Sequence, residues 1–180
     1  MAAIARSPPF SLMSRLSGAL AVLLAVAVAV SAQPVAAHVT GNRDVLDALP
    51  FELPTQQHLK GKIRSSPGHR LHVVSLVLGD EPVFADVRKF TLITSRGVAA
   101  AVGAGGTGDS MIPFESIPVG QEIGQVLPTD AMLALTRTSP TTVMLELGPH
   151  GTIAFLFEVL VDAEVRALRL PDGRELPLKR

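Results

Sequence analysis

Apolar and polar residues alternate along much of the second half of the chain, which is the pattern of half-buried strands. The longest alternation runs over Ile153–Val161, where several of the intervening positions are apolar as well. A strand that is apolar on both faces is buried on both faces, so we expect Ile153–Val161 to be a central strand. The segment Thr142–Leu147 alternates cleanly and places Val143, Leu145 and Leu147 on one face.

Further short strands are expected where β-branched and apolar runs lie between turn signals. These runs are Leu71–Leu78, Val83–Thr94, Val98–Val102, Ala131–Thr136, Val165–Leu170 and Arg174–Leu178. The last two are joined by Pro171-Asp172-Gly173, and an Asp-Gly pair tolerates the positive φ angles of a tight hairpin turn. No segment has a sustained helical period, so the pattern predicts an all-β fold, an antiparallel immunoglobulin-like β-sandwich of roughly seven to eight strands.

The N-terminal region has a different pattern, because Leu16–Val30 is a predominantly apolar stretch of about 15 residues that follows Arg6 and Arg15. This arrangement is typical of an export signal, so we expect a secreted or periplasmic protein. The small residues required by a signal peptidase allow cleavage after Ala32 or after Ala37, and we favour the second. Retention as an uncleaved anchor is a third alternative, although the stretch is shorter than the ~20 residues of a spanning helix.

The rest of the chain has the length of one domain. Pro50 and Pro54 interrupt regular structure near its start, where we expect at most a short helical turn over Asn42–Leu49. We therefore divide the chain into a signal peptide at residues 1–37, an irregular N-terminal arm at residues 38–66 and a β-sandwich domain at residues 67–180.

The composition excludes several classes of function. The chain has no Cys, which rules out disulfides, thiolate metal sites and cysteine nucleophiles. Its 16 basic and 16 acidic side chains balance, and loss of Arg6 and Arg15 with the signal leaves a slightly acidic domain. Such a domain lacks the basic surface expected of a nucleic-acid partner or a protein bound to anionic membranes. The absence of Trp and Tyr also argues against a sugar-binding platform.

Five segments, which mostly encode strands and turns, carry a resemblance to a known group of domains. They are Pro67–Val74, Phe90–Gly97, Ile117–Gly124, Ala154–Val159 and Arg166–Leu170. Over about residues 67–178 the chain resembles the telokin-like, immunoglobulin-like domains of exported bacterial proteins. It departs from them at Val98 and Ala99, where an aromatic residue is usual, and in the insert Gly103–Pro113. The resemblance implies a fold and an exported location, and it implies no chemistry.

Gly103, Gly105 and Gly108 match a G-x-G-x-x-G spacing. In dinucleotide-binding proteins these glycines lead into a helix whose N-terminus meets the pyrophosphate. Here Pro113 follows soon afterwards and no amphipathic helix is expected. We therefore interpret the segment as a loop or a glycine-rich hairpin tip.

Ser110 lies in Gly-Asp-Ser-Met, a sequence similar to the nucleophile block of one family of serine esterases. Such a serine needs a histidine base and an acid that orients the base. His150 is the candidate base, but Leu147 stands where the usual aspartate would precede it. A hydrolase centred on Ser110 and His150 is therefore a minor hypothesis, and an exposed loop serine is the expected alternative.

The histidines supply the metal-site candidates. His69 and His72 are three residues apart, so on a strand they point to opposite faces, with His69 exposed and His72 half-buried. His38 would become the first residue after cleavage behind Ala37. Its imidazole and the new α-amino group could then chelate copper, with a second histidine completing the site.

The carboxylates form no obvious pair, and most are expected on solvated turns. Glu158 lies inside the most apolar strand, and a buried unpaired carboxylate is costly. We expect Glu158 to face water or to pair with Arg166 or Arg169.

Together these observations favour an exported, non-enzymatic β-sandwich that binds an unidentified protein or envelope component. No cofactor is expected, and neither is stable membrane insertion once the signal is removed. The apolar strands over residues 131–147 are the expected docking edge for a partner strand. The alternative function is a copper-binding protein that uses His38.

Overall fold

The computed structural model describes residues 35–46, 48–53, 60–107 and 109–179. They all belong to one compact unit, Ala32–Arg180. The expected signal peptide therefore lies outside the described residues except for its last three positions, Val35–Ala37. Within the described part every regular element is a β-strand or a 3₁₀ turn, and all strand pairs are antiparallel. The all-β expectation is confirmed.

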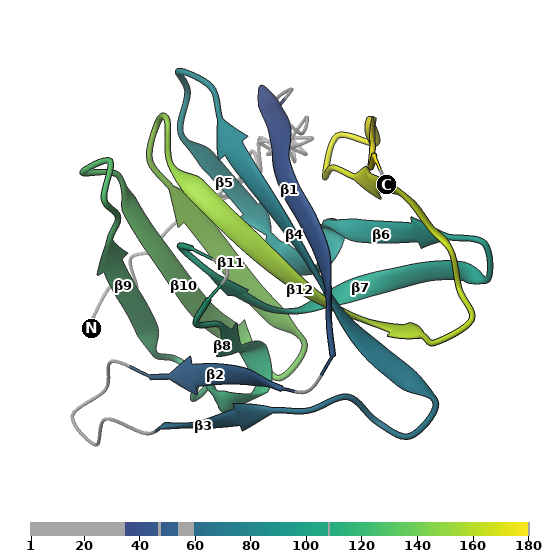
Figure 1. Cartoon of the computed structure of the whole chain (residues 1–180). Helices are drawn as coiled ribbons and strands as arrows, with labels where there is room; N and C mark the ends of the chain where they lie inside the picture. Colours follow the sequence, from purple (N-terminus) through teal and green to yellow (C-terminus); the bar gives the residue numbers. More distant parts are fainter. Residues whose placement is uncertain (1–34, 47, 54–59, 108, 180) are drawn as a thin grey trace, which may run out of the picture. The chain divides into compact units, whose positions relative to one another are not determined.

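Strand β12 (Thr152–Leu160) lies in the middle of the largest sheet, as its two-sided apolar pattern predicts. It pairs with β4 (His69–Leu78) on one side and with β7 (Gly97–Gly105) on the other (Figure 1). The strand order is β1-β4-β12-β7-β6-β13-β14, and β8 also pairs with β7. The remaining strands of this main sheet are β1 (Ala37–Val45), β6 (Thr91–Thr94), β8 (Ile112–Pro113), β13 (Val165–Arg169) and β14 (Glu175–Pro177).

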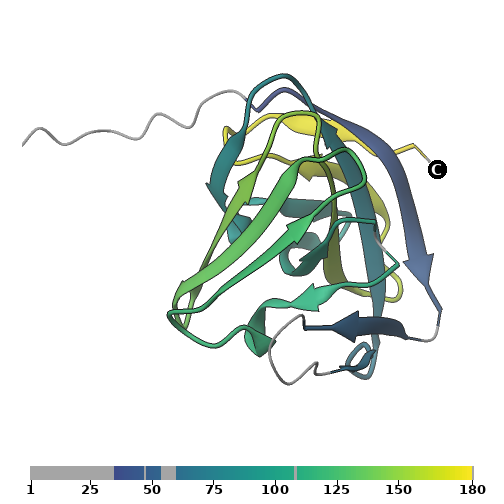
Figure 2. The same ribbon diagram turned by 90° about the vertical axis from the view of Figure 1, so that its left-hand side faces the viewer.

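A four-stranded sheet packs against the inner face of the main sheet (Figure 2). Its order is β5-β11-β10-β9, with bounds Val83–Asp86, Thr142–Leu147, Met132–Ser139 and Glu122–Val126 respectively. The two inner faces share one apolar core. In it the rings of Phe90 and Phe155 stack with their centroids 4.3 Å apart and an interplanar angle of 24°.

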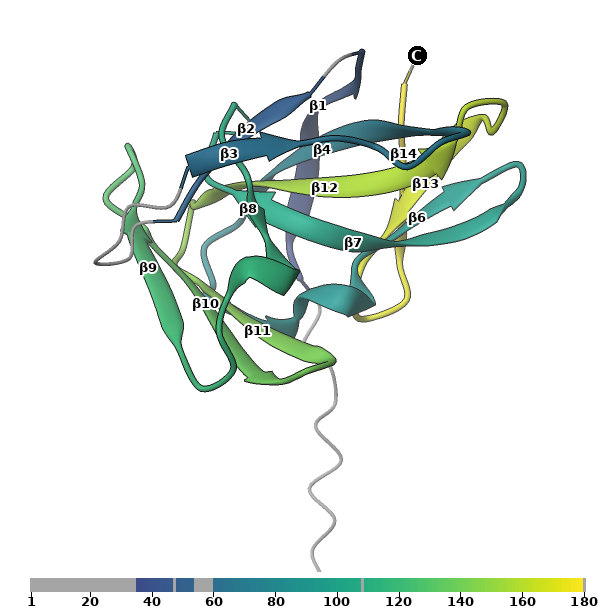
Figure 3. The ribbon, with the colours of Figure 1, turned by 90° about the horizontal axis from the view of Figure 1, so that it is seen from below.

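A third layer explains why β12 is apolar on both faces. The hairpin of β2 (Leu49–Glu52) and β3 (Lys60–Ile63) lies on the opposite side of β12 from the four-stranded sheet (Figure 3). There a second buried cluster forms from Leu49, Leu71, Val73, Met111, Ala154 and Leu156. The core-facing and hairpin-facing sides of β12 are therefore both removed from water.

Two local expectations from the sequence are confirmed. Strand β11 spans Thr142–Leu147 and buries Val143, Leu145 and Leu147. Strands β13 and β14 form a hairpin across the Pro-Asp-Gly turn. Gly173 adopts φ +88° there and donates its N–H to the Leu170 carbonyl at 2.9 Å.

The expectation of an irregular arm at residues 38–66 is wrong, because this stretch contains β1, β2 and β3. The helical turn expected over Asn42–Leu49 is likewise replaced by strand as far as Val45. A register shift between Val39 and Gly41 interrupts the alternation of β1, which concealed the strand in the sequence. The strand exists because β4 supplies its hydrogen-bonding partner.

The stretch Val83–Thr94 is divided between two sheets rather than forming one strand. Strand β5 joins the four-stranded sheet, a 3₁₀ turn follows at Val87–Lys89, and β6 joins the main sheet. The Asp86 side chain accepts the Arg88 N–H at 3.0 Å and so caps this turn. The chain thereby passes from one sheet to the other. A second 3₁₀ turn, Phe114–Ser116, links β8 to the loop before β9.

The predicted docking edge at residues 131–147 is also wrong. Strands β10 and β11 lie inside the four-stranded sheet, and its edges are β5 and β9. The alternating pattern identified these strands as half-buried but carried no information on their neighbours.

Candidate functional site

A buried histidine, an aspartate and an arginine meet on the core-facing side of the main sheet. Nδ1 of His72 lies 2.7 Å from Oδ1 of Asp44, and Nε of Arg70 lies 2.9 Å from the same oxygen. His72 is only 4% exposed, which is more buried than its expected half-buried position. We call Asp44, Arg70 and His72 the Asp44 cluster.

Strand pairing brings the cluster together. Asp44 in β1 is the register partner of His72 in β4, and His72 is in turn the partner of Phe157 in β12. Directly opposed residues of an antiparallel pair have Cβ atoms about 5 Å apart, so the carboxylate reaches the imidazole. Arg70 lies two positions before His72 and shares its face of the strand.

Arg70 also ties the cluster to the turn that follows β12. Its guanidinium donates hydrogen bonds to the carbonyls of Leu160, Val161 and Ala163, the last at 2.8 Å. Charge-assisted hydrogen bonds of this kind are stronger than those between neutral groups. These hydrogen bonds and the contact with Asp44 occupy the Arg70 side chain, which therefore connects β1, β4 and the turn after β12.

A cleft of about 460 Å³ opens beside the cluster, where the first and last strands of the main sheet approach each other. Nδ2 of Asn42 in β1 donates to the Lys179 carbonyl just beyond β14, at 2.8 Å. We call this the seam cleft. Its described lining includes Arg43, Arg70, Lys179, His72 and three carboxylates, but no hydroxyl or thiol side chain.

The protonation states of the cluster follow from its surroundings. Burial lowers the pKa of His72 below its ordinary value of 6.5, even though Asp44 favours the charged form. Burial alone would raise the pKa of Asp44, but hydrogen bonds from His72 and Arg70, with the Arg70 charge, outweigh it and lower that pKa. A neutral imidazole therefore donates its Nδ1–H to a carboxylate. Nε2 is left buried without a hydrogen-bond partner among the described residues.

We expect the protein to lose stability as the pH falls below about 6.5, the ordinary pKa of histidine. The folded state lowers the pKa of His72, so the unfolded chain binds this proton more readily. The stabilising contribution is complete above that pH and declines below it by at most about 1.4 kcal/mol per pH unit. Urea unfolding at about pH 7.5 and about pH 5.5 measures this difference.

The His72→Gln variant should show a smaller difference between the two pH values, since glutamine does not titrate. His38→Gln is the matched control, because His38 is exposed on β1. If His72→Gln keeps the whole pH dependence of the wild type, the buried imidazole is not its source.

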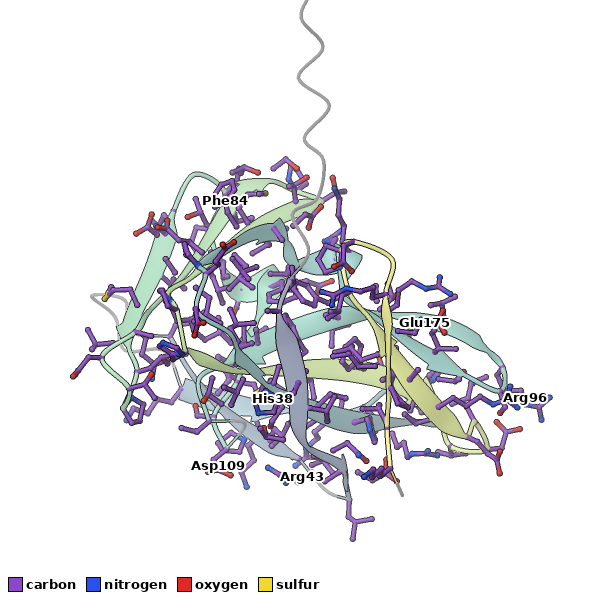
Figure 4. All side chains as sticks on the ribbon, turned by 90° about the horizontal axis from the view of Figure 1, so that it is seen from above. His38, Arg43, Phe84, Arg96, Asp109 and Glu175 are labelled. Atoms are coloured by element: carbon purple, nitrogen blue, oxygen red, sulfur yellow. The ribbon has the colours of Figure 1, made fainter. Side chains whose placement is uncertain are left out.

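The structure places the proposed copper ligand His38 on the exposed side of β1, where it is paired in register with Val77 (Figure 4). No group of three or more His, Asp or Glu side chains suited to a metal occurs in the described part of the chain. His69 is not in the Asp44 cluster, and its Nδ1 lies 3.2 Å from the Pro67 carbonyl oxygen. The copper hypothesis thus rests on His38 alone.

Ser110 and His150 have different neighbours. The Ser110 carbonyl packs against Gly105 of β7. The His150 ring lies in a turn, where its Nε2 is 3.6 Å from Asp80, and its backbone N–H donates to Gly79. The interactions of these two residues thus provide no nucleophile–base pair.

The interpretation of the glycine-rich segment as a loop or hairpin tip is wrong for its first two glycines, which lie in a paired strand. Gly103 and Gly105 lie in β7, and β8 pairs back onto this strand. A Cβ atom on Gly105 would lie 2.3 Å from the Ser110 carbonyl oxygen. The glycines thus permit close backbone approach, while Gly108 lies outside the described residues.

Glu158 is half-buried, and its carboxylate accepts the backbone N–H of Ser66. The carboxylate thus has a backbone hydrogen-bond donor, which the sequence did not suggest. Asp162 forms an exposed ion pair with Arg96. Arg43 and Asp109, labelled in Figure 4, form another exposed ion pair at 3.5 Å.

The outward face of the four-stranded sheet carries exposed apolar side chains. Phe84 in β5 is 71% exposed, Val126 in β9 is 63% exposed and Met132 in β10 is 50% exposed. Val126 and Met132 are direct register partners, and alternation places Phe84 on the same face, across Glu146 and Ala134. We call Phe84, Val126 and Met132 the outer-face patch.

Comparison with protein-family models, with curated proteins and with solved structures finds no match to this chain. In the described part, no helix is both long and apolar enough to span a membrane. The telokin-like resemblance therefore remains a prediction, and functional inference rests on the geometry.

Sequence reasoning missed two members of the Asp44 cluster. Asp44 was assigned to an irregular arm, and Arg70 was considered only as part of the segment Pro67–Val74. A usable signal was present, because Arg70 and His72 are polar residues on one face of a strand whose later positions on that face are apolar. The position of Asp44 depends on the pairing of β1 with β4, which the sequence does not encode locally.

Proposed function

We propose that this chain is an exported, non-enzymatic binding module that docks a partner protein of the cell envelope on its outer-face patch. The observation that carries the proposal is the exposure of Phe84, Val126 and Met132 on one face of one sheet. Large apolar side chains grouped on a surface mark interaction sites, because leaving them in water costs free energy that a partner recovers.

The surroundings of the patch indicate what kind of partner fits. Asp86, Glu122 and Glu146 lie at outward positions of the same sheet. Glu146 lies between Phe84 and the Val126–Met132 pair, so carboxylates are interspersed with the apolar side chains of the patch. A complementary partner therefore presents apolar side chains flanked by Lys or Arg.

We also propose that the two sheets form an immunoglobulin-like sandwich. Two antiparallel sheets that enclose one core support it. The main sheet also curls, so that β1 and the end of β14 approach each other at the seam cleft. The fold that we propose is therefore a sandwich whose larger sheet is strongly curved.

Replacing Phe84 with aspartate should weaken partner binding by roughly thirtyfold, the effect of losing an aromatic hot spot worth about 2 kcal/mol. A photo-crosslinking residue at Met132 of the full chain, in the organism that makes it, captures the partner, and mass spectrometry identifies it. The Phe84→Asp substitution in the same chain should remove this adduct. The identified partner then allows Kd to be measured.

Val98→Asp is the matched control. Val98 is 60% exposed on β7 of the main sheet, so the control places the same charge on another exposed apolar position. Both variants should keep the wild-type unfolding midpoint, since neither side chain is buried. Equal loss of the adduct in both, or its persistence in Phe84→Asp, would refute docking on the outer-face patch.

A further inference from the structure

Val35, which precedes β1, is an integral part of the folded domain. Its side chain is 8% exposed and packs in the main core. Its backbone N–H donates to Oδ2 of Asp172 at 3.1 Å, and its carbonyl accepts a hydrogen bond from the Arg174 guanidinium. Arg174 and Asp172 also pair with each other, with Nε 2.8 Å from Oδ2. We call these three residues the Val35 clamp.

Ala36 is held by a different part of the chain. Its carbonyl accepts the Gly79 N–H at 2.7 Å, and Ala37 then forms the first register pair of β1 with Leu78. A Cβ atom at position 79 would lie 2.8 Å from the Cβ atom of Ala36. Ala36 thus occupies the space that a side chain at position 79 would need, which is consistent with the glycine there.

Removal of Val35 and Ala36 would leave two defects. The Asp172 side chain, only 8% exposed, would lose one of its hydrogen-bond donors, and the core would lose an apolar side chain. Burial opposes ionisation of Asp172, but hydrogen bonds from Arg174 and Val35 outweigh it and hold its pKa below the ordinary value. The hydrogen bonds of Asp172 in the β13–β14 turn are therefore complete only when Val35 is present.

We propose that the export leader is removed at the Ala32–Gln33 bond, so that the mature protein begins at Gln33 and keeps Val35 and Ala36. A signal peptidase catalyses the addition of water across this amide. Ala32 leaves with the new carboxylate and Gln33 gains the α-amino group. Ala32 provides the small residue directly before the scissile bond that such a peptidase requires. Of the two cleavage points in the sequence, this one alone retains the Val35 clamp.

This processing has a consequence for His38. The imidazole then lies within β1, five residues after the mature N-terminus, and has no α-amino group of its own. The amino-terminal copper chelate considered from the sequence does not form on such a chain. The proposal rests on the export that the proposed function includes, but not on the outer-face patch, so docking and processing can fail separately.

The test is to express the full chain in a bacterium, recover the exported protein and identify its N-terminal peptide by tandem mass spectrometry. We expect a peptide that begins at Gln33, either open or with its side-chain amide cyclised onto the amino group. An exported protein that begins at His38, or one that retains the leader, overturns the proposal.

Two full-length variants separate the possible cleavage points, because a β-branched residue directly before the scissile bond, in place of the small residue, blocks the peptidase. Ala37→Val should leave the N-terminus at Gln33. Ala32→Val should abolish that product. The reverse result, with processing lost in Ala37→Val and unchanged in Ala32→Val, would place the cut at Ala37. The wild-type N-terminus remains decisive even if a variant does not fold.

Discussion

Replacing Phe155 with alanine should lower the free energy of unfolding by about 3–5 kcal/mol, the range for truncation of a buried phenylalanine. Phe155 is fully buried, lies on the central strand β12 and stacks on Phe90 between the two sheets. Its loss removes apolar contacts and leaves a cavity that the paired strands around it cannot close. Equilibrium unfolding in guanidinium chloride measures the change.

Phe84→Ala is a control of the same residue type. Phe84 is on the outward face of the four-stranded sheet, so its truncation should change the unfolding free energy by only about 0.5 kcal/mol or less. A cost for Phe84→Ala comparable to that for Phe155→Ala would mean that the inner and outer faces of that sheet are assigned wrongly.

Replacing Gly105 with alanine should destabilise the protein by about 1–3 kcal/mol, as expected when a close-packed contact is forced apart. The added Cβ would lie 2.3 Å from the Ser110 carbonyl oxygen and 3.3 Å from Sδ of Met111. The obstructing oxygen belongs to the backbone, so the β7–β8 hairpin must move to admit the methyl group. Thermal or denaturant unfolding of the variant measures the cost.

Gly41→Ala serves as the control, because a Cβ atom there would have no described atom within 4 Å. It should leave stability within about 0.5 kcal/mol of the wild type. If Gly105→Ala is as harmless as Gly41→Ala, close packing of β8 on β7 does not explain the glycine-rich segment.

The sequence contained strong evidence for some elements because their signal is local. The two-sided apolar pattern over Ile153–Val161 identified a central strand, and the Asp-Gly turn identified the hairpin of β13 and β14. In both cases the residues that carry the signal are the residues that form the structure. The resulting strand assignments hold to within a residue or two at their ends.

The candidate sites were less predictable. The Asp44 cluster joins residues that are 26 and 28 positions apart, and their meeting depends on the register of β1 against β4. The outer-face patch depends on which strands lie side by side in the four-stranded sheet. An alternating pattern reports that one face is buried but not which neighbouring strand buries it.

The amino-acid sequence alone determined that the chain is rich in strands, lacks thiol chemistry and starts with a segment typical of an export signal. Only the tertiary structure decided that residues before position 67 belong to the fold, that β10 and β11 are interior strands, and that Val35 is held by Asp172 and Arg174. The physical reason is that periodicity and turn propensity act between near neighbours. Strand partners, ion pairs between strands and close backbone contacts arise between segments that only folding brings together.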